Sequence, residues 1–300
     1  MKDSYGREVT SLRLSVTQRC QLACFYCHNE GQEKNDHEMS PAGIERFVRV
    51  ARSIGIIRTK ITGGEPLVRK DIVEIVARIA PHMEETSLVT NGILLEKYAA
   101  GLKQAGLARV NVDLPSLRPA VYRRVTGRGF MSQALSAIGA AVAQGLAVKV
   151  NTVVLKGIND NEIEDLIDFV AGNNSVLQLI ELEASREEME SGLFQEHHLD
   201  LGPLENRLEA LAARVETRRL HHRRKYFLPR GGSEAAVEVV RPMHNTEFCA
   251  NCSRIRLTAD GKLKPCLLSN DGLIDAAGKS EKETMEAFAV AIKNRRPYWQ

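Results

Sequence analysis

The stretch Leu12-Arg-Leu-Ser-Val-Thr-Gln-Arg-Cys20-Gln-Leu-Ala-Cys24-Phe-Tyr-Cys27 places a short β-like run directly before three cysteines. These cysteines are separated by three residues and then by two, so one loop can wrap the corner of a metal centre. Zinc ribbons usually use two separated C-x-x-C pairs, whereas thiolates also hold cubane iron–sulfur clusters. The spacing therefore favours an iron–sulfur cluster in the loop that follows the first strand.

The remaining cysteines form a second group of three, Cys249, Cys252 and Cys266. An odd number in each group argues against self-contained disulfide sets, and closed zinc sites normally take four protein ligands. Three thiolates per site indicate an iron–sulfur cluster with one iron open to a non-protein ligand. Because His28 and His244 could complete two zinc sites, a zinc-stabilised nucleotide-binding or RNA-binding protein stays as an alternative.

Short β-like runs alternate with amphipathic helical runs over the first part of the chain. The expected strands are 12–16, 59–62, 87–90, 110–114, 148–155 and 177–182, and the expected helices are 41–53, 70–81, 94–104, 132–144 and 162–171. Ser40 and Pro41 are a typical N-cap and first helical residue. Six β–α alternations predict an α/β fold with a parallel sheet and right-handed crossovers, curved into a partial (β/α)6 TIM-like barrel.

This alternation weakens near residue 185. We therefore expect a half-barrel domain over residues 1–185 and a C-terminal α+β region over 186–300 that closes the open side of the barrel. In that region we expect helices at 204–213 and 282–293, strands at 226–228 and 235–240, and a hairpin of 254–258 with 262–265 around Ala259-Asp260-Gly261. The polar segment 29–38 is expected to be a mobile loop.

Polar and glycine-rich signals follow the expected strands. They are Thr62-Gly63-Gly64-Glu65-Pro66, Thr90-Asn91-Gly92, Asp113 to Ser116 and Lys156-Gly157. In a barrel these strand ends share one rim, where active sites are built, and the first cysteine loop lies on the same rim. An exposed strand end with free carbonyls and the Glu65 carboxylate would suit the ammonium group of an amino acid.

Composition narrows the possible classes of protein. The chain has 300 residues, of which 43% are apolar and 26% charged, so it is not wholly disordered. Its 41 Lys and Arg against 38 Asp and Glu give +3, too balanced for a nonspecific nucleic-acid coat. No apolar run reaches the roughly 18 residues of a membrane span, and the N-terminus lacks a secretory pattern. We expect a cytoplasmic protein without a membrane or nucleic-acid partner.

The C-x-x-x-C-x-x-C loop together with Gly63-Gly64-Glu65-Pro66 on a half-barrel resembles the radical S-adenosylmethionine superfamily. The second group, with two residues and then thirteen between its cysteines, resembles the second-cluster motif of the GTP 3′,8-cyclase family, also called molybdenum cofactor biosynthesis protein A. Segments LRLSVTQRC, ITGGEPLVRKDI, VTNG, NTVVLKGIND and LQLIELE are similar to that family as well. The resemblance runs from about Ser11 to Asp275.

The resemblance implies a lyase with two [4Fe-4S] clusters and S-adenosyl-L-methionine. Cys20, Cys24 and Cys27 would hold the first cluster, which binds S-adenosylmethionine and reduces it to a 5′-deoxyadenosyl radical. That radical would take hydrogen from C3′ of GTP, whose C3′ would then attack C8 to give 3′,8-cyclo-7,8-dihydro-GTP. The second cluster, on the second cysteine group, would hold the guanine. The product would feed molybdenum cofactor (molybdopterin) biosynthesis.

By resemblance, the GTP contacts are Arg13, Lys60, Thr90, Lys156, Arg254, the backbone at Ile255, and Arg256, of which Arg13, Arg254 and Arg256 are the catalytic candidates. Arg254 and Arg256 alternate on a strand, so both can point to one side, and arginine suits phosphate. Four or five cations around the barrel mouth would balance a ligand of about −4. For S-adenosylmethionine the resemblance points to Tyr26, Gly64 and Asp113. Tyr26 could instead cover the cluster from water.

The sequence departs from the family pattern in four places, one of which is Gln18, where an Asp is common in the cluster loop. The stretch Asn111-Val-Asp113-Leu-Pro115-Ser116 usually reads N-V-S-L-D-S, and Gln178 stands where an Arg is common. The family often ends in a Gly-Gly tail, whereas this chain ends Arg295-Arg-Pro-Tyr-Trp-Gln300. Another basic group substitutes for that tail, some members act without it, or the substrate differs.

A two-cluster radical S-adenosylmethionine enzyme that modifies a peptide is the second enzymatic alternative. Such enzymes also carry auxiliary clusters in C-terminal extensions, but the Arg-x-Arg beside Cys252 counts against that reading. The partners implied by the leading resemblance are GTP, an electron donor and a downstream cyclic pyranopterin monophosphate synthase. A homodimer is possible.

Overall fold

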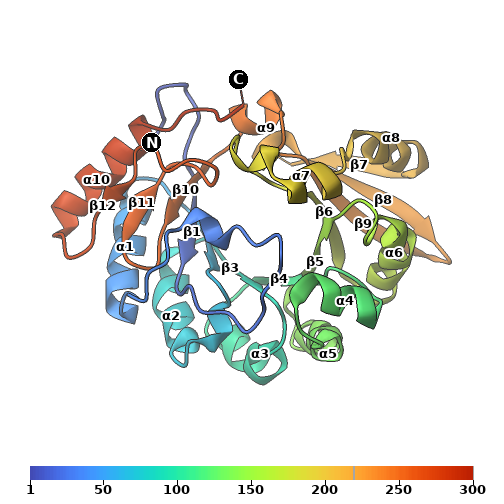
Figure 1. The fold of residues 1–300 in the computed structure, drawn as a ribbon. Helices are drawn as coiled ribbons and strands as arrows, with labels where there is room; N and C mark the ends of the chain where they lie inside the picture. The colour runs from blue at the N-terminus through green and yellow to red at the C-terminus, as the bar shows by residue number, and fades with distance from the viewer. Residues whose placement is uncertain (219, 300) are drawn as a thin grey trace.

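Six parallel strands form the wall of a partial barrel. They are β1 (Ser11–Ser15), β2 (Arg58–Thr62), β3 (Glu85–Thr90), β4 (Arg109–Asp113), β5 (Ala147–Val154) and β6 (Val176–Glu181). In this computed structural model, which describes residues 1–218 and 220–299, each strand pairs in parallel with the next. Figure 1 shows the strands around a central space with the helices outside. The predicted α/β partial barrel is confirmed.

The helices that cover the outer face follow the strands in turn. They are α1 (Pro41–Ser53), α2 (Ile72–Ile79), α3 (Leu95–Gln104), α4 (Pro119–Thr126), α5 (Met131–Ala143) and α6 (Ile163–Gly172). α1 buries Ile44, Phe47, Val48 and Ala51, which recur at helical spacing on one face. Sequence analysis missed α4, a two-turn helix that begins at a proline and ends at Gly127 in the left-handed conformation (φ 71°).

The C-terminal region adds strands to both edges of this barrel. On one side, β9 (Ser233–Val240) pairs in parallel with β6, and β8 (Arg224–Arg230) and β7 (Arg214–Thr217) follow in antiparallel order. On the other side, β10 (Arg254–Leu257) pairs in parallel with β1, followed by β11 (Lys262–Lys264) and β12 (Ile274–Asp275). The expected extension therefore continues the barrel sheet at both ends, giving one 12-stranded sheet.

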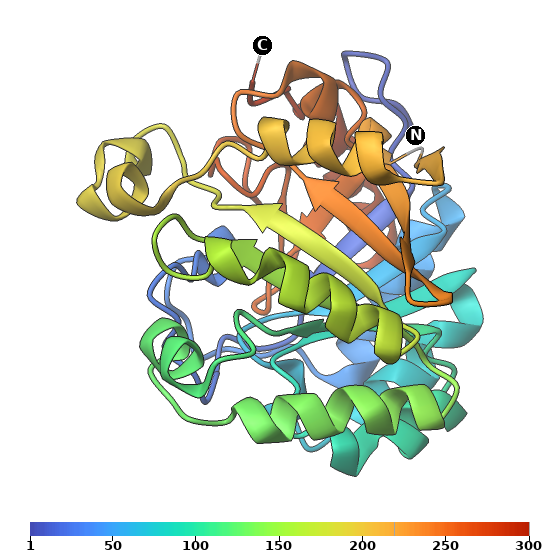
Figure 2. The ribbon, with the colours of Figure 1, turned by 90° about the vertical axis from the view of Figure 1, so that its right-hand side faces the viewer.

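The remaining helices flank or bridge these edges. They are α7 (Gly192–His197), α8 (Gly202–Leu211), α9 (Thr246–Ala250) and α10 (Glu281–Lys293). The segment that holds α9 connects β9 to β10 and so joins the two edges of the barrel (Figure 1). Figure 2 shows α5, α6 and α8 one above another on the outer side of β5 to β9. The expected hairpin at 254–265 is confirmed as β10 and β11.

One apolar core serves the barrel and the C-terminal strands together. Leu14 and Val150 from the barrel belong to the same buried cluster as Val239, Leu257 and Phe288. The division at residue 185 stays a prediction, because the sheet and the core continue across it. No helix in residues 1–218 and 220–299 is both long and apolar enough to span a membrane.

The N-cap of α1 offers a test of the local folding signal. The Ser40 hydroxyl accepts a hydrogen bond from the backbone N–H of Gly43 (3.2 Å). We expect Ser40→Ala to lower the free energy of unfolding by about 1 kcal/mol, and Ser40→Gly by only a few tenths, because glycine is tolerated at the N-cap. Chemical denaturation of both variants checks this, and equal losses would show that the hydroxyl is not the cap.

Candidate active site

A cavity of about 550 Å³ runs along the inside of the barrel. Cys20, Cys24 and Cys27 line it on the rim where the strands end. Arg58, the first residue of β2, and Arg109, the first residue of β4, line it where strands begin. The cavity therefore reaches from the cysteine loop down the inner wall of the barrel, so ligands can contact the whole length of the strands.

The first cysteine loop is held against the end of β2 by close backbone contacts. The N–H of Gly64 donates to the Thr17 carbonyl (2.7 Å), and the N–H of Glu65 donates to the Arg19 carbonyl (2.8 Å). A Cβ atom on Gly64 would lie 2.5 Å from the Arg19 oxygen, so only glycine fits there. Gly64 also lines the cavity, as its predicted contact with S-adenosylmethionine requires.

The thiols of this loop suit an iron–sulfur cluster. Burial, and next the proximity of Cys27, raise the pKa of Cys24 to about 12, and burial also raises the pKa of Cys20 and Cys27. Thiolate is the form that binds a metal, and a bound metal would favour ionisation of these thiols. Across residues 1–218 and 220–299, no three His, Cys, Asp or Glu side chains converge as a site for one metal ion. A cubane takes each thiolate at a separate iron, so the three thiolates need not converge on one ion.

The second cysteine group lies at the border of the same cavity. Cys249, Cys252 and Cys266 are free thiols that do not line the cavity, but their neighbours Ser253 and Leu267 do. These three residues come from α9, from the turn before β10 and from the turn after β11. The fold thus brings the two groups of three cysteines to one cavity.

Basic side chains surround the second cysteine group. Arg7 donates to the Cys249 carbonyl (2.8 Å), and the nearly fully buried Arg295 donates to the Cys252 carbonyl (2.7 Å). Burial opposes ionisation of Cys252, but Arg295 and Arg254 outweigh it and lower the pKa of that thiol. Thiolate is the form that binds iron, so this environment also fits a cluster.

The expected role of Glu65 is wrong. Its side chain is 1% exposed and its carboxylate accepts hydrogen bonds from the Thr90 hydroxyl (2.8 Å) and from the N–H groups of Asn91 (2.6 Å) and Leu67 (2.9 Å). The carboxylate therefore ties the end of β2 to the end of β3 and is not free for an ammonium group. Thr90, a predicted GTP contact, lines the cavity while its hydroxyl serves this link.

Five cations project into the cavity from three neighbouring parallel strands. In register, they are Arg256, Arg13 and Lys60 in one row, and Arg254 and Arg58 on either side of Ser11 in the next row. All five line the cavity. They lie along three adjacent strands and not around the barrel mouth. β10 contributes two of them because it pairs directly with β1. The expectation of a ring of cations at the mouth is corrected accordingly.

Most of this positive charge lacks a counter-charge. Among the residues that the structure describes, the side chains of Arg254 and Arg58 make no hydrogen bond or ion pair, and Lys60 donates only to the Asn111 amide oxygen (3.2 Å). Burial and the nearby arginines 109 and 13 lower the pKa of Lys60 well below its usual range. Burial and then Arg13 lower the pKa of Arg254 to about 9. A polyanion would supply the missing charge.

Four other predicted site residues do not belong to this group of cations. Lys156 is exposed and is not among the cavity-lining residues, and Ile255 is fully buried with its backbone on β10 between the two arginines. Asp113 lines the cavity near Tyr26 and accepts a hydrogen bond from the Asn151 amide (2.8 Å). Tyr26 also lines the cavity and packs edge-on against Phe25.

Sequence analysis missed a row of polar side chains across the opposite wall. The Asn111 amide donates to Asn151 (3.0 Å), Gln178 donates to Asn151 (3.1 Å), and Arg223 donates to Gln178 (3.0 Å). Arg223 directly precedes β8. It places a cation beside Gln178, the position where the family often has an Arg. A sequence signal for this row is that Asn111 and Asn151 are polar residues within two expected barrel strands.

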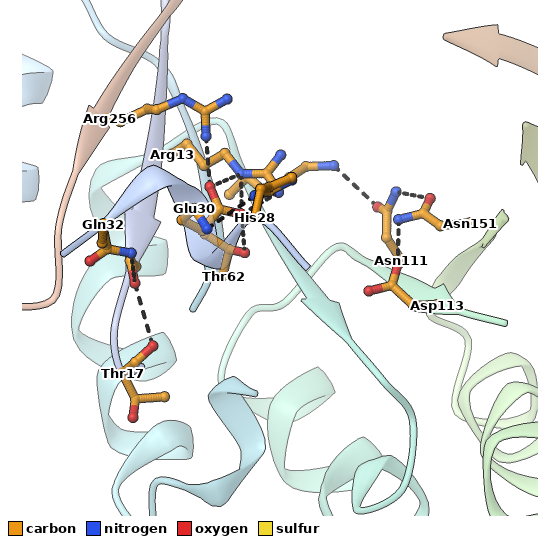
Figure 3. A network of polar contacts seen from close by, with 12 residues as sticks. Arg13, Thr17, His28, Glu30, Gln32, Thr62, Asn111, Asp113, Asn151 and Arg256 are labelled. Carbon is orange, nitrogen blue, oxygen red and sulfur yellow. Dashed lines mark hydrogen bonds and ion pairs between the residues drawn. The ribbon is translucent and has the colours of Figure 1, made fainter. Parts of the chain in front are cut away.

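The segment 29–38, expected to be a mobile loop, makes polar contacts with the barrel. Gln32 donates to the Ser15 hydroxyl (2.9 Å) and Asn35 donates to Asp260 (2.9 Å). His28 caps the backbone at the start of this segment, because its Nδ1 accepts a hydrogen bond from the Glu30 N–H (3.1 Å). Glu30 itself is buried and its carboxylate reaches Arg13 and Arg256 (Figure 3). These contacts fix the segment to β1 and to the turn after β10.

Comparison with known proteins agrees with this site. Residues 14–170 match the family model of the radical SAM superfamily, and residues 175–300 match Molybdenum Cofactor Synthesis C. The chain is therefore a radical S-adenosylmethionine protein, a class that uses S-adenosylmethionine and an iron–sulfur cluster. It is 50% identical to "Probable GTP 3′,8-cyclase" of Thermococcus kodakarensis over 99% of both chains, and 42% identical to the protein of that name from Archaeoglobus fulgidus over 100% of this chain and 99% of the other. Within the superfamily, the chain belongs to the GTP 3′,8-cyclase family.

Solved structures show the same fold at low identity. Streptococcus suis SuiB bound to S-adenosylmethionine gives a TM-score of 0.69 at 16% identity, covering 94% of this chain and 65% of SuiB. Native anSMEcpe with bound AdoMet gives 0.66 at 16% identity, covering 96% of this chain and 82% of that protein. At this identity the likeness concerns the fold alone.

The carboxylate of Asp113 provides a pH test of its predicted contact with S-adenosylmethionine. Burial raises its pKa to about 6, although Asn151 favours the ionised form. A protonated Asp113 is a poorer acceptor, so we expect affinity for S-adenosylmethionine to fall as the pH drops from about 7 through about 6. Equilibrium binding to the anaerobically reconstituted protein measures this. Asp113→Asn should remove the pH dependence, and an unchanged profile in that variant would rule out the role.

Proposed function

We propose that the protein converts GTP to 3′,8-cyclo-7,8-dihydro-GTP in molybdenum cofactor biosynthesis. The observation that carries this proposal is the set of five cavity cations on β10, β1 and β2, placed between two groups of three cysteines. A cavity with this charge favours a polyanionic substrate such as a nucleoside triphosphate. Relatives named probable GTP 3′,8-cyclase, identical at about half of their positions, support the same substrate.

Both cysteine groups fit a cluster in this proposal. Cys20, Cys24 and Cys27 would hold a [4Fe-4S] cluster that supplies the electron for reductive cleavage of S-adenosylmethionine. Cys249, Cys252 and Cys266 would hold a second [4Fe-4S] cluster. Tyr26, Gly64 and Asp113 would bind S-adenosylmethionine beside the first loop, since all three line the cavity near it.

The cations of the barrel wall would bind and orient the substrate. Arg13, Arg254 and Arg256 would contact the triphosphate together with Lys60, and Thr90, Lys156 and the Ile255 backbone are further proposed contacts. Holding the triphosphate at the strand middles would keep the nucleoside within the barrel between the two cysteine groups. The protein's share of the catalysis is this placement and the exclusion of water.

The other partners also belong to the proposal. An electron donor must deliver the reducing equivalent, and a cyclic pyranopterin monophosphate synthase would consume the product. The peptide-modifying alternative gains no support from the likeness to SuiB, because that likeness concerns the fold alone.

Matched cysteine variants test the assignment of the two sites. We expect Cys24→Ala to abolish formation of 5′-deoxyadenosine from S-adenosylmethionine in the anaerobically reconstituted, dithionite-reduced protein. We expect Cys266→Ala to keep that cleavage and to lose the cyclised GTP product, because the second site would hold the guanine. Mass spectrometry of both products measures this, and each variant should lose about half of the bound iron.

Each variant serves as the control of the other, since both remove one thiol. Retained cleavage of S-adenosylmethionine by Cys24→Ala would contradict the assignment of the first site. Unchanged cyclisation in Cys266→Ala would refute the second. Cleavage without any change in GTP by the unmodified protein would point to a different substrate.

A further inference from the structure

Glu30 is the acidic side chain that lies directly against the cavity cations. Its carboxylate accepts hydrogen bonds from Arg13 Nη2 (2.7 Å) and Nε (2.9 Å), from Arg256 Nη1 (2.6 Å) and from the Thr62 hydroxyl (2.9 Å). Figure 3 shows the carboxylate between these groups, which come from β1, β10 and β2. One buried carboxylate therefore joins the first cysteine loop to three strands of the cavity wall.

The backbone around Glu30 has an unusual conformation that turns this side chain inward. Asn29 (φ 44°) and Glu30 (φ 54°) both lie in the left-handed region, which residues other than glycine rarely adopt. Such conformations persist only where the surroundings hold them, and they cluster at functional sites. Here the ion pairs with Arg13 and Arg256 hold the backbone of Glu30 in this conformation. The same two arginines outweigh the burial of Glu30 and keep the pKa of its carboxyl well below the usual range.

The bonds to Glu30 use only part of each guanidinium. Arg13 presents the edge formed by Nε and Nη2, so its Nη1 points elsewhere. Arg256 uses Nη1, which leaves its Nε and Nη2 donors. Because a guanidinium is planar with five donors in a fixed fork, holding one edge fixes the direction of the other. Both arginines line the cavity, so free donors remain available to a ligand there.

We propose that Glu30 is a positioning residue that orients Arg13 and Arg256 for the oxyanions of a polyphosphate. The inference rests on the proposed function, in which these arginines contact the triphosphate of GTP. Without Glu30, two guanidinium groups on directly paired strand positions would repel each other and lose their common anchor. Glu30 lowers the net charge of the site but supplies a fixed geometry.

Charge and geometry make opposite predictions for variants of Glu30. If the carboxylate only competes with an anion, Glu30→Gln tightens polyphosphate binding and Glu30→Asp, which keeps the charge, leaves it unchanged. If it positions the arginines, both variants weaken binding. Aspartate is one methylene too short to reach both arginines, and glutamine offers its amide N–H₂ to one of two cations.

The test uses calorimetry on the anaerobically reconstituted protein with GTP, inorganic triphosphate and S-adenosylmethionine as separate ligands. We expect Glu30→Asp and Glu30→Gln each to weaken the binding of GTP and inorganic triphosphate about tenfold, the effect of misaligning one charge-assisted hydrogen bond. Affinity for S-adenosylmethionine should stay unchanged. Thr62→Val, which removes one bond to Glu30 and no charge, should weaken triphosphate binding about threefold.

Glu38→Gln is the matched control. Glu38 lies in the same polar segment and pairs with Arg19 (2.9 Å), but neither residue lines the cavity. This variant should bind GTP and inorganic triphosphate with the affinity of the unmodified protein.

The results separate the inference from the function on which it rests. Equal or tighter triphosphate binding by the Glu30 variants, with normal binding by the unmodified protein, would overturn the role of Glu30 alone. A parallel loss of S-adenosylmethionine binding would make Glu30 a loop-stabilising residue and overturn it too. An unmodified protein that binds neither GTP nor triphosphate would overturn the proposed function and the inference with it.

Discussion

The site depends on one strand pairing, the parallel ladder between β1 and β10. These strands are separated by more than two hundred residues of chain, yet their register sets Arg256 beside Arg13 and Arg254 beside Ser11. β2 pairs on the other side and adds Lys60 to the same row. A shift of β10 by one residue would turn Arg254 and Arg256 to the opposite face of the sheet. The same ladder carries the second cysteine group to the cavity that the first group lines.

This arrangement concentrates like charges in a partly buried space, which is costly unless a counter-charge is present. The protein supplies one carboxylate at Arg13 and Arg256 and leaves Arg254 and Lys60 without an acidic partner among the described residues. Elsewhere on the inner wall Glu238 pairs with Lys149 (2.5 Å) and also lies within ion-pair distance of Arg218 (3.6 Å) and Arg223 (3.9 Å). The unpaired cations on β10 and β2 are the basis for placing an anionic ligand there.

Local patterns made part of this structure predictable. The six barrel strands and the helix from Pro41 followed from hydrophobic periodicity and capping, and cysteine spacing identified both groups of thiols. Long-range pairing was not predictable, because no local signal places β10 beside β1. Glu30 was missed because it lies in a polar segment that resembles a surface loop. The role of Glu65 was misjudged because its use depends on the neighbouring strand β3, whose Thr90 and Asn91 consume its acceptors.

The affinity of the unmodified, reconstituted protein for GTP, GDP, GMP and guanosine tests the central claim most directly. If the cations of β10, β1 and β2 recognise the triphosphate, calorimetry will show a stepwise loss of affinity as each phosphate is removed, and added salt will reduce the difference. Equal affinity across the four ligands would contradict the account, because the cavity cations would then have no part in recognising the substrate.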